Sequence, residues 1–222
     1  GDGWPCWALS NHDCMRSATR WGGDQPDPRL LRLAAAFQMG LRGTVCLYQG
    51  EELGLPEAQV AFEDLQDPYG ITMWPEFKGR DGCRTPMPWQ AAAPHAGFSS
   101  AAKTWLPLDA RHTALAVDQQ TGSDSLLSYF KQIIAWRKQQ PALIHGDMQL
   151  WETDEQTLAF VREHEGERVL CVFNFSDRTT ELSLPAEWAQ ASAMTESGTH
   201  GVHVESQRLR FEPWGCAFLR CA

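Results

Sequence analysis

The sequence predicts an α/β segment followed by an all-β domain. The first fifty residues hold two short apolar runs with an amphipathic stretch between them, a pattern typical of a β–α–β unit. From about Gly146 the chain changes to short alternating or apolar runs separated by turn residues, which is typical of antiparallel strands. We therefore expect two domains, residues 1–145 and residues 146–222.

The composition limits the classes of partner. The 222 residues are 43% hydrophobic and carry a formal net charge of −9. This excess of negative charge disfavours nucleic acids and anionic membrane surfaces. No apolar run approaches the roughly 18 residues of a membrane span. We expect no nucleic-acid or membrane partner, and a neutral or cationic ligand.

The cysteines indicate a reducing compartment. Seven cysteines occur without a Cys-x-x-Cys pair, and no Cys/His cluster has the spacing of zinc ligands. Free thiols at irregular spacings are typical of cytoplasmic proteins. We predict a cytoplasmic location and no cofactor.

The first strand ends in a polar motif. Residues 4–9 are apolar, and Ser10-Asn11-His12-Asp13 follows directly. In a parallel barrel, residues at the C-terminal end of a strand face the active site. Three polar residues after a strand are also a common turn, so this motif needs support from the rest of the chain.

A helix and a second strand complete the unit. Asp27 and Pro28 are typical of a helix start, with an N-cap followed by proline at the first helical position. Apolar residues at 30, 34, 37 and 41 share one helix face, and Gly43 suits the helix end. Residues 44–48 are continuously apolar, as in a strand covered on both faces.

A long irregular stretch follows, at about 51–122. A loop of this length is usually functional or disordered. We expect order, because its aromatic residues need burial: Phe62, Trp74, Phe77, Trp89 and Trp105. Ser123-Asp124 then predicts the cap of a helix that Pro141 ends. The later runs, at 158–162, 169–175, 182–184, 208–211 and 216–220, predict an antiparallel β-sandwich.

Three further segments, residues 48–54, 62–68 and 79–89, carry a family resemblance. They read YQGEELG, FEDLQDP and GRDGCRTPMPW, and they follow Ser10-Asn11-His12-Asp13 in this order. Together the four motifs closely resemble the α-glucosidases of the α-amylase superfamily, glycoside hydrolase family 13, in the oligo-1,6-glucosidase branch. The resemblance implies the last two β/α units of a (β/α)8 TIM barrel, followed by an antiparallel β-sandwich domain.

The resemblance also implies roles for the first motif. Glycosidic cleavage passes through an oxocarbenium-like transition state, which a fixed carboxylate stabilises. By resemblance, Asp13 is that transition-state stabiliser, and His12 contacts hydroxyls of the glucose at the cleavage subsite. The implied substrates are α-glucosides of short oligosaccharides, cleaved with retention from the non-reducing end.

Four further residues are candidates for substrate binding. The resemblance implies an arginine that contacts the non-reducing-end glucose, and Arg80 is preferred over Arg84. The alternative for the other arginine is a salt bridge to Asp81 or Glu76. Glu57 borders the leaving-group subsite or is a solvated surface residue. Arg16 orients a neighbouring carboxylate or forms an ion pair outside the site. For Glu51 and Glu52 we expect structural hydrogen bonds.

The nucleophile and the acid/base of the family follow strands four and five, which this sequence does not contain. Retaining glycosidases need these two carboxyl groups about 5 Å apart. We therefore expect the C-terminal portion of an α-glucosidase, inactive alone, that pairs with its N-terminal barrel half or self-associates. The family's calcium loop lies near the start of the barrel, so we expect no metal here.

Two alternatives stay open. Within the enzymes, a transglycosylating relative such as an isomaltulose synthase, a trehalose synthase or a sucrose-acting enzyme shares these motifs. In another class, the chain is a non-catalytic relative of the family or a carbohydrate-binding module. The intact His12-Asp13 pair and the order of the barrel motifs favour the enzyme.

Overall fold

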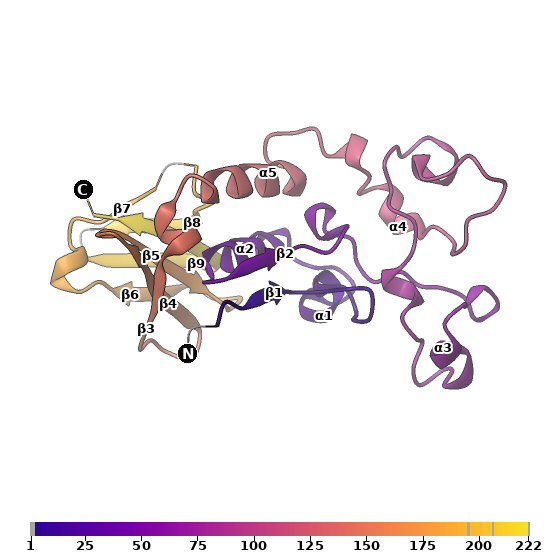
Figure 1. The fold of residues 1–222 in the computed structure, drawn as a ribbon, viewed down its shortest axis with the longest axis horizontal. Coiled ribbons are helices and arrows are strands. Elements are labelled where there is room, and N and C mark those ends of the chain that lie inside the picture. The colour runs from indigo at the N-terminus through magenta and orange to yellow at the C-terminus, as the bar shows by residue number, and fades with distance from the viewer. Residues whose placement is uncertain (1–2, 195, 206, 222) are drawn as a thin grey trace. The chain divides into compact units, whose positions relative to one another are not determined.

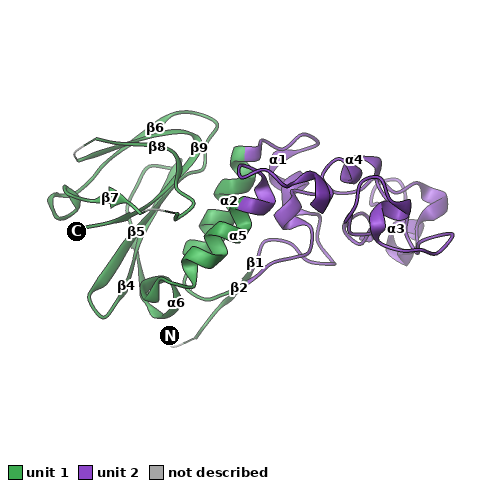
Figure 2. Cartoon of the chain, turned by 90° about the horizontal axis from the view of Figure 1, so that it is seen from above, with its two compact units in different colours: residues 1–7, 29–45, 129–222 green, residues 8–28, 46–128 purple. Residues whose placement is uncertain are grey.

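A computed structural model describes residues 3–194, 196–205 and 207–221. Two compact units divide the chain (Figure 2). The first comprises residues 1–7, 29–45 and 129–222. The second comprises residues 8–28 and 46–128. Among the described residues, no helix combines the length and the apolar character that crossing a membrane requires.

The predicted β–α–β order is confirmed. It consists of β1 (Cys6–Ala8), α2 (Pro28–Gly40) and β2 (Thr44–Cys46), with β1 beside β2 in a two-stranded sheet (Figure 1). Trp7 joins the strand to the helix in the first unit. Its indole Nε1 donates to the Arg42 carbonyl at 2.8 Å, and its own carbonyl accepts from Gln38 Nε2 at 2.9 Å.

Helix α5 (Leu126–Arg137) begins later than predicted. Ser125 Oγ accepts from the backbone N–H of Ser128 at 3.1 Å, so the cap predicted at Ser123-Asp124 is wrong by one to two residues. Pro141 does not end α5 directly but opens the short helix α6 (Pro141–His145). Within the first unit, the Trp136 ring of α5 packs on Phe218, with ring centroids 4.8 Å apart.

The C-terminal part of the first unit is antiparallel, as predicted, and its strands form one curled sheet (Figure 1). The order is β3-β4-β5-β9-β6, and β7 and β8 also pair with β9. The strands are β3 (Asp147–Trp151), β4 (Thr157–His164), β5 (Glu167–Asn174), β6 (Thr180–Ser183), β7 (Ser192–Ala193), β8 (His200–Glu205) and β9 (Arg208–Arg220).

Strand β9 makes the curl possible. Its first part, Arg208–Phe211, pairs with β6, whereas Cys216–Leu219 pairs with β5. Trp214 between these parts has a left-handed backbone, with φ of 60°. The prediction of two separate runs at 208–211 and 216–220 therefore found the two halves of one strand.

The helix and the sheet of this unit approach closely at Gly40. A Cβ atom there would lie 3.2 Å from the Phe160 ring and 3.3 Å from the Phe173 ring, so the position favours glycine. Arg162 is fully buried and donates hydrogen bonds to the backbone at the same place. Its guanidinium donates to the carbonyls of Gly40 (2.8 Å), Gly146 (2.9 Å) and Asp147 (3.1 Å).

The second unit is mostly irregular. Its helices are short: α1 (Ser17–Gly22), α3 (Pro68–Thr72) and α4 (Ala110–Thr113). Five 3₁₀ turns accompany them, at Glu51–Leu53, Phe62–Asp64, Asp81–Cys83, Pro94–Gly97 and Val117–Gln119. Its apolar cluster is small, with Leu53, Leu55 and Met87 as the buried members. Side-chain bonds to the backbone supply much of the order, as where His112 Nε2 meets the Pro56 carbonyl at 2.8 Å.

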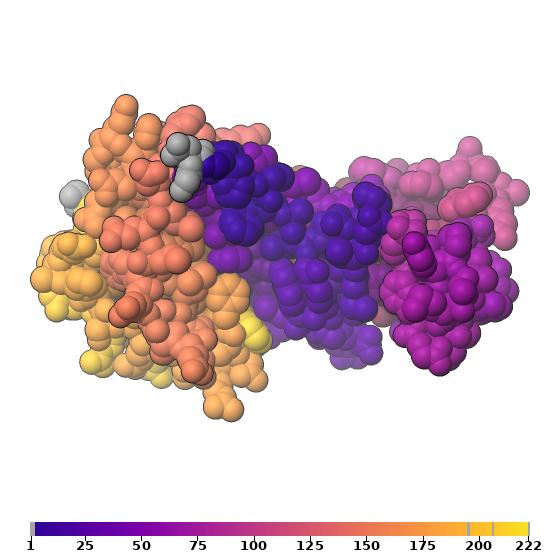
Figure 3. Space-filling model, turned by 60° about the horizontal axis from the view of Figure 1, so that its bottom comes forward, coloured from indigo at the N-terminus to yellow at the C-terminus, as the bar shows by residue number. Residues whose placement is uncertain are grey.

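The expected burial of the aromatic residues in this unit is wrong. Trp105 is 77% exposed, and Phe62, Phe77 and Trp89 are also exposed. Trp74 alone of the five is half-buried. Figure 3 shows one face of the segment from about residue 60 to 108, in magenta to pink. The irregular path therefore depends on polar contacts rather than on an aromatic core.

Candidate functional site

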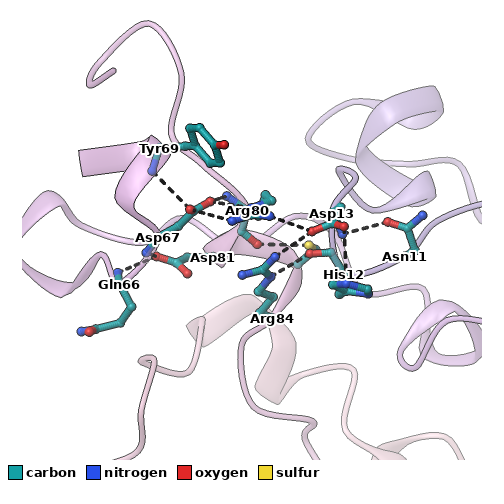
Figure 4. A network of polar contacts seen from close by, with 10 residues as sticks. Asn11, His12, Asp13, Gln66, Asp67, Tyr69, Arg80, Asp81 and Arg84 are labelled. Atoms are coloured by element: carbon teal, nitrogen blue, oxygen red, sulfur yellow. Dashed lines mark hydrogen bonds and ion pairs between the residues drawn. The ribbon is translucent and has the colours of Figure 1, made fainter. Parts of the chain in front are cut away.

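The site lies in the second unit, around Asp13. Asn11 Oδ1 accepts from the Asp13 backbone N–H at 2.8 Å, which fixes the turn after β1. The Asp13 side chain is 50% exposed, and His12 Nε2 lies 3.4 Å from its Oδ2. The two residues predicted to act together are thus neighbours on an accessible surface (Figure 4).

Two arginines meet on one oxygen of Asp13. Arg80 Nη1 donates to Oδ1 at 3.0 Å, and Arg84 Nη2 donates to the same atom at 2.8 Å. Partial desolvation acts to raise the pKa of Asp13, but His12 and the two arginines outweigh it. The pKa of Asp13 therefore lies below its usual value, and the carboxylate is ionised at neutral pH.

Arg80 is held from its other side by Asp67. Asp67 Oδ2 accepts from Arg80 Nε at 2.9 Å, and Oδ1 accepts from Arg80 Nη2 at 3.0 Å, a two-point contact (Figure 4). The Asp67 side chain is 0% exposed. Hydrogen bonds from Arg80 hold the pKa of Asp67 well below its usual range.

Sequence reasoning missed Asp67 as a site residue. The signal was present, because Asp67 precedes Pro68 and caps α3, accepting from the Tyr69 backbone N–H at 3.2 Å. An aspartate before a proline is typical of a helix cap, so the motif by itself does not point to a second role. The contact with Arg80, thirteen residues later, becomes visible only in the folded chain.

Arg84 belongs to the site as well. Besides its bond to Asp13, its Nε donates to the His12 carbonyl at 2.7 Å. Asp81, one of the alternative partners, instead accepts from the backbone N–H groups of Gln66 (2.6 Å) and Asp67 (2.8 Å). The structure thus brings both arginines, Arg80 and Arg84, to the carboxylate of Asp13.

Arg16 lies inside the unit rather than at its surface. It is 2% exposed, and burial lowers its pKa. Its Nη1 donates to the Gln49 carbonyl at 2.8 Å, and its Nη2 donates to the Cys83 carbonyl at 3.0 Å. Its Nε is buried without a hydrogen-bond partner in the described part of the chain. A side chain buried in this way is not accessible to a substrate, which argues against direct substrate binding.

Glu57 is half-buried, and burial raises the pKa of its carboxyl group. Its Oε2 accepts from the Arg16 backbone N–H at 2.8 Å. The residue also lines a pocket of about 360 Å³ in this unit, together with Met15, Thr19 and Gly82 among others. Glu57 is therefore neither a free surface residue nor part of the Asp13–Arg84 contact.

Glu51 and Glu52 make structural hydrogen bonds, as expected. Glu51 accepts from the Ser10 hydroxyl and, at 3.1 Å, from the Tyr48 backbone N–H. Glu52 accepts from the Gly50 N–H at 2.8 Å. The bond between Ser10 and Glu51 connects the residues after β1 with those after β2, and the other two lie within the segment after β2. In the described part of the chain, no group of three or more His, Cys, Asp and Glu side chains is arranged to hold a metal ion.

Comparison with known proteins agrees with the fold. The family model described as alpha amylase, catalytic domain, matches residues 1–146, and that of the maltogenic amylase C-terminal domain matches residues 148–217. The chain is 44% identical, over its whole length, to a probable alpha-glucosidase of Rhizobium meliloti. It is 33% identical over 96% of its length to a glucan 1,6-alpha-glucosidase of Streptococcus dysgalactiae.

Solved structures give the same result. An alpha-glucosyl transfer enzyme, XgtA, superposes with a TM-score of 0.92 and 51% identity, over 99% of this chain and 41% of that one. An isomaltulose synthase from Klebsiella sp. superposes with a TM-score of 0.81 and 26% identity, over 98% of this chain and 43% of that one. The chain spans 40% and 42% of the two curated relatives. It belongs to the α-amylase family, and it combines part of the catalytic domain with an antiparallel C-terminal domain.

Proposed function

We propose that the chain is the C-terminal portion of a retaining, exo-acting α-glucosidase that hydrolyses α-glucosidic bonds of short oligosaccharides. The observation that carries this proposal is the half-exposed carboxylate of Asp13, held by Arg80 and Arg84 beside His12. Relatives named alpha-glucosidase and glucan 1,6-alpha-glucosidase support it.

Asp13 is suited to stabilise an oxocarbenium-like transition state. Both arginines bind its Oδ1, so they keep the group ionised and fix its orientation while Oδ2 has no arginine partner among the described residues. Positive charge that develops on the sugar ring is stabilised by a carboxylate held in advance. The His12 side chain lies beside Asp13 and is 69% exposed, so it is accessible for a hydrogen bond with a sugar hydroxyl.

The substrate-binding roles follow from how each side chain is held. Arg80 is locked by Asp67 and is still partly exposed, which suits contact with the non-reducing-end glucose. Arg84 is bound to Asp13 and the His12 carbonyl, which suits a role in fixing the carboxylate. Glu57, at its pocket, is placed in the leaving-group subsite in this proposal.

The two carboxyl groups that break the bond are not assigned to this chain. Asp13 stabilises charge, which is a different task from attack on carbon or proton transfer. We propose that the nucleophile and the acid/base lie in the part of the relatives' length that this chain does not span. The chain alone is then inactive, and its partner is the remaining portion of the barrel or, failing that, a second copy.

A transglycosylating enzyme is the second candidate. The similarity to XgtA, at 51% identity, favours it. Hydrolysis and transfer differ in whether water or a sugar hydroxyl takes the glucosyl group. Product analysis on maltose, with and without an added acceptor sugar, separates the two.

The test of the main proposal is hydrolysis of p-nitrophenyl α-glucoside by the complete protein and by the 222-residue chain, with intact masses recorded. We expect turnover only in the complete protein, and Asp13→Asn should lower kcat by about 10²- to 10³-fold. Asp177→Asn, an exposed carboxylate in the first unit, is the matched control. Full activity of Asp13→Asn would contradict the proposal.

Two coarser features complete the proposal. We place the domain boundary near residue 145, and the family models, which end at 146 and begin at 148, support it. We also propose a cytoplasmic location, which the irregular spacing of the seven cysteines, with no Cys-x-x-Cys pair, supports.

A further inference from the structure

We propose that Arg16 is a positioning residue, a buried clamp that sets the place of Asp13 and Arg84 without touching substrate. The inference deepens the proposed function and rests on it. It goes beyond the assigned site because Arg16 contacts neither of the residues that it would position through its side chain. The contacts that it does make lie on either side of them.

The guanidinium of Arg16 joins two loops that are far apart in sequence. Its Nη1 donates to the Gln49 carbonyl, which follows β2, and its Nη2 donates to the Cys83 carbonyl. Tyr48 strengthens this junction, because its ring lies 5.3 Å from the guanidinium and its hydroxyl donates to the same Cys83 carbonyl at 2.9 Å. Two donors thus hold one carbonyl oxygen in place.

These contacts are connected to the site through Cys83 and Arg84. Cys83 directly precedes Arg84, and Arg84 donates to Asp13 Oδ1 at 2.8 Å and to the His12 carbonyl at 2.7 Å. Asp13 in turn stands three residues before Arg16. A displacement of the Cys83 carbonyl therefore moves Arg84, and with it the two polar contacts that orient the Asp13 segment.

The contacts of Arg16 with the Gln49 and Cys83 carbonyls require a planar, forked cation. Lysine presents a point charge on a flexible stem, whereas the arginine fork donates to two carbonyls in fixed directions. The backbone beside Arg16 is also adapted to it. Gly50 has φ of 92°, and a Cβ atom there would lie 2.7 Å from Arg16 Nη1.

The competing explanation is that Arg16 only stabilises the fold. The two explanations differ in whether the effect of replacing Arg16 on turnover depends on Asp13. A residue that acts through Asp13 loses its influence on turnover once Asp13 can no longer stabilise the transition state, whereas an independent stabilising residue does not. A double-mutant cycle therefore separates them.

The experiment uses the complete protein with Arg16→Lys, Asp13→Asn and the double variant, assayed on p-nitrophenyl α-glucoside below the unfolding temperature. We expect Arg16→Lys to lower kcat by about 10- to 100-fold, since small misplacements in active sites have costs of this size, with KM changed less than about twofold. In the Asp13→Asn background the same substitution should lower kcat less than about threefold.

Arg162→Lys is the matched control, because Arg162 is equally buried and also bonds only carbonyl oxygens, in the other unit. It should lower the Tm and leave kcat and KM unchanged. If Arg16→Lys does not fold, Tyr48→Phe removes a single hydroxyl bond from the same carbonyl. It should lower kcat by about threefold to tenfold, again only when Asp13 is intact.

Equal loss of kcat from Arg16→Lys in both backgrounds, or no loss in folded Arg16→Lys, would overturn the clamp and leave the proposed function standing. Full turnover by Asp13→Asn would overturn the proposed function itself. The two failures are therefore distinguished, because the second is read from Asp13→Asn alone and the first from the effect of Arg16→Lys with and without Asp13→Asn.

Discussion

Asp67 and Asp13 bind the same guanidinium from two sides. Asp67 accepts hydrogen bonds from Nε and Nη2 of Arg80, and Asp13 accepts one from Nη1 at 3.0 Å. One carboxylate is fully buried and the other is half-exposed. Arg80 is therefore anchored by the buried acid and presented to the accessible one, and these two carboxylates raise its pKa above the ordinary value.

Removal of the anchor should impair the site. In Asp67→Asn the two-point contact with Arg80 is lost, so Arg80 becomes free to move relative to Asp13. For the complete protein we expect kcat/KM on p-nitrophenyl α-glucoside to fall by about 10- to 100-fold. Asp64→Asn is the control, since the ion pair of the Asp64 carboxylate is a long contact with Lys103, at 3.9 Å, rather than a two-point contact with Arg80. Equal activity of the two variants would contradict the anchoring role.

The same pair predicts a dependence of stability on pH. Because Arg80 lowers the pKa of Asp67 in the folded state, the carboxylate stabilises the fold fully above its unfolded pKa, about 3.9. The stabilisation is lost as the pH falls through the lower folded value. The difference in Tm between the wild type and Asp67→Asn should therefore be constant from pH 7 to pH 5 and shrink below pH 4. A difference that grows toward low pH would contradict this sign.

His112 predicts a second pH effect, nearer neutrality. It is fully buried, and desolvation lowers its pKa. The unfolded chain then binds a proton at about pH 6.5 that the folded unit does not, so stability falls as the pH drops through that value. His112→Gln should lose this part of the decrease in Tm between pH 7.5 and pH 5.5. His203→Gln, an exposed histidine, should keep it.

Arg162 predicts a large effect on stability alone. In Arg162→Met, the carbonyls of Gly40, Gly146 and Asp147 lose their donor inside the first unit. Since each buried unsatisfied group costs about 1–3 kcal/mol, we expect the free energy of unfolding to fall by about 3 kcal/mol or more in urea titrations. A change below about 1 kcal/mol would show that water or another donor replaces the arginine.

The sequence predicted the regular elements where local chemistry decides them. Proline at position 28 and the apolar spacing of α2 fixed that helix, and turn residues bounded β4 and β5. It missed β3 and β8, because Asp147–Trp151 and His200–Glu205 mix polar residues into strands whose partners supply the stability. The prediction that Trp105 is buried is wrong. Burial depends on which surfaces the fold brings together, and a local sequence pattern does not contain that information.

For the site, the sequence by itself determined which side chains are available: His12 and Asp13 after the first strand, and two arginines about seventy residues later. It also determined the family, through four motifs in order. Only the tertiary structure decided that Arg80 and Arg84 share one oxygen of Asp13, that Asp67 anchors Arg80, and that Arg16 is buried. The reason is that hydrogen bonds across 67 or 71 residues depend on how loops return in space, and no local pattern in the chain encodes that return.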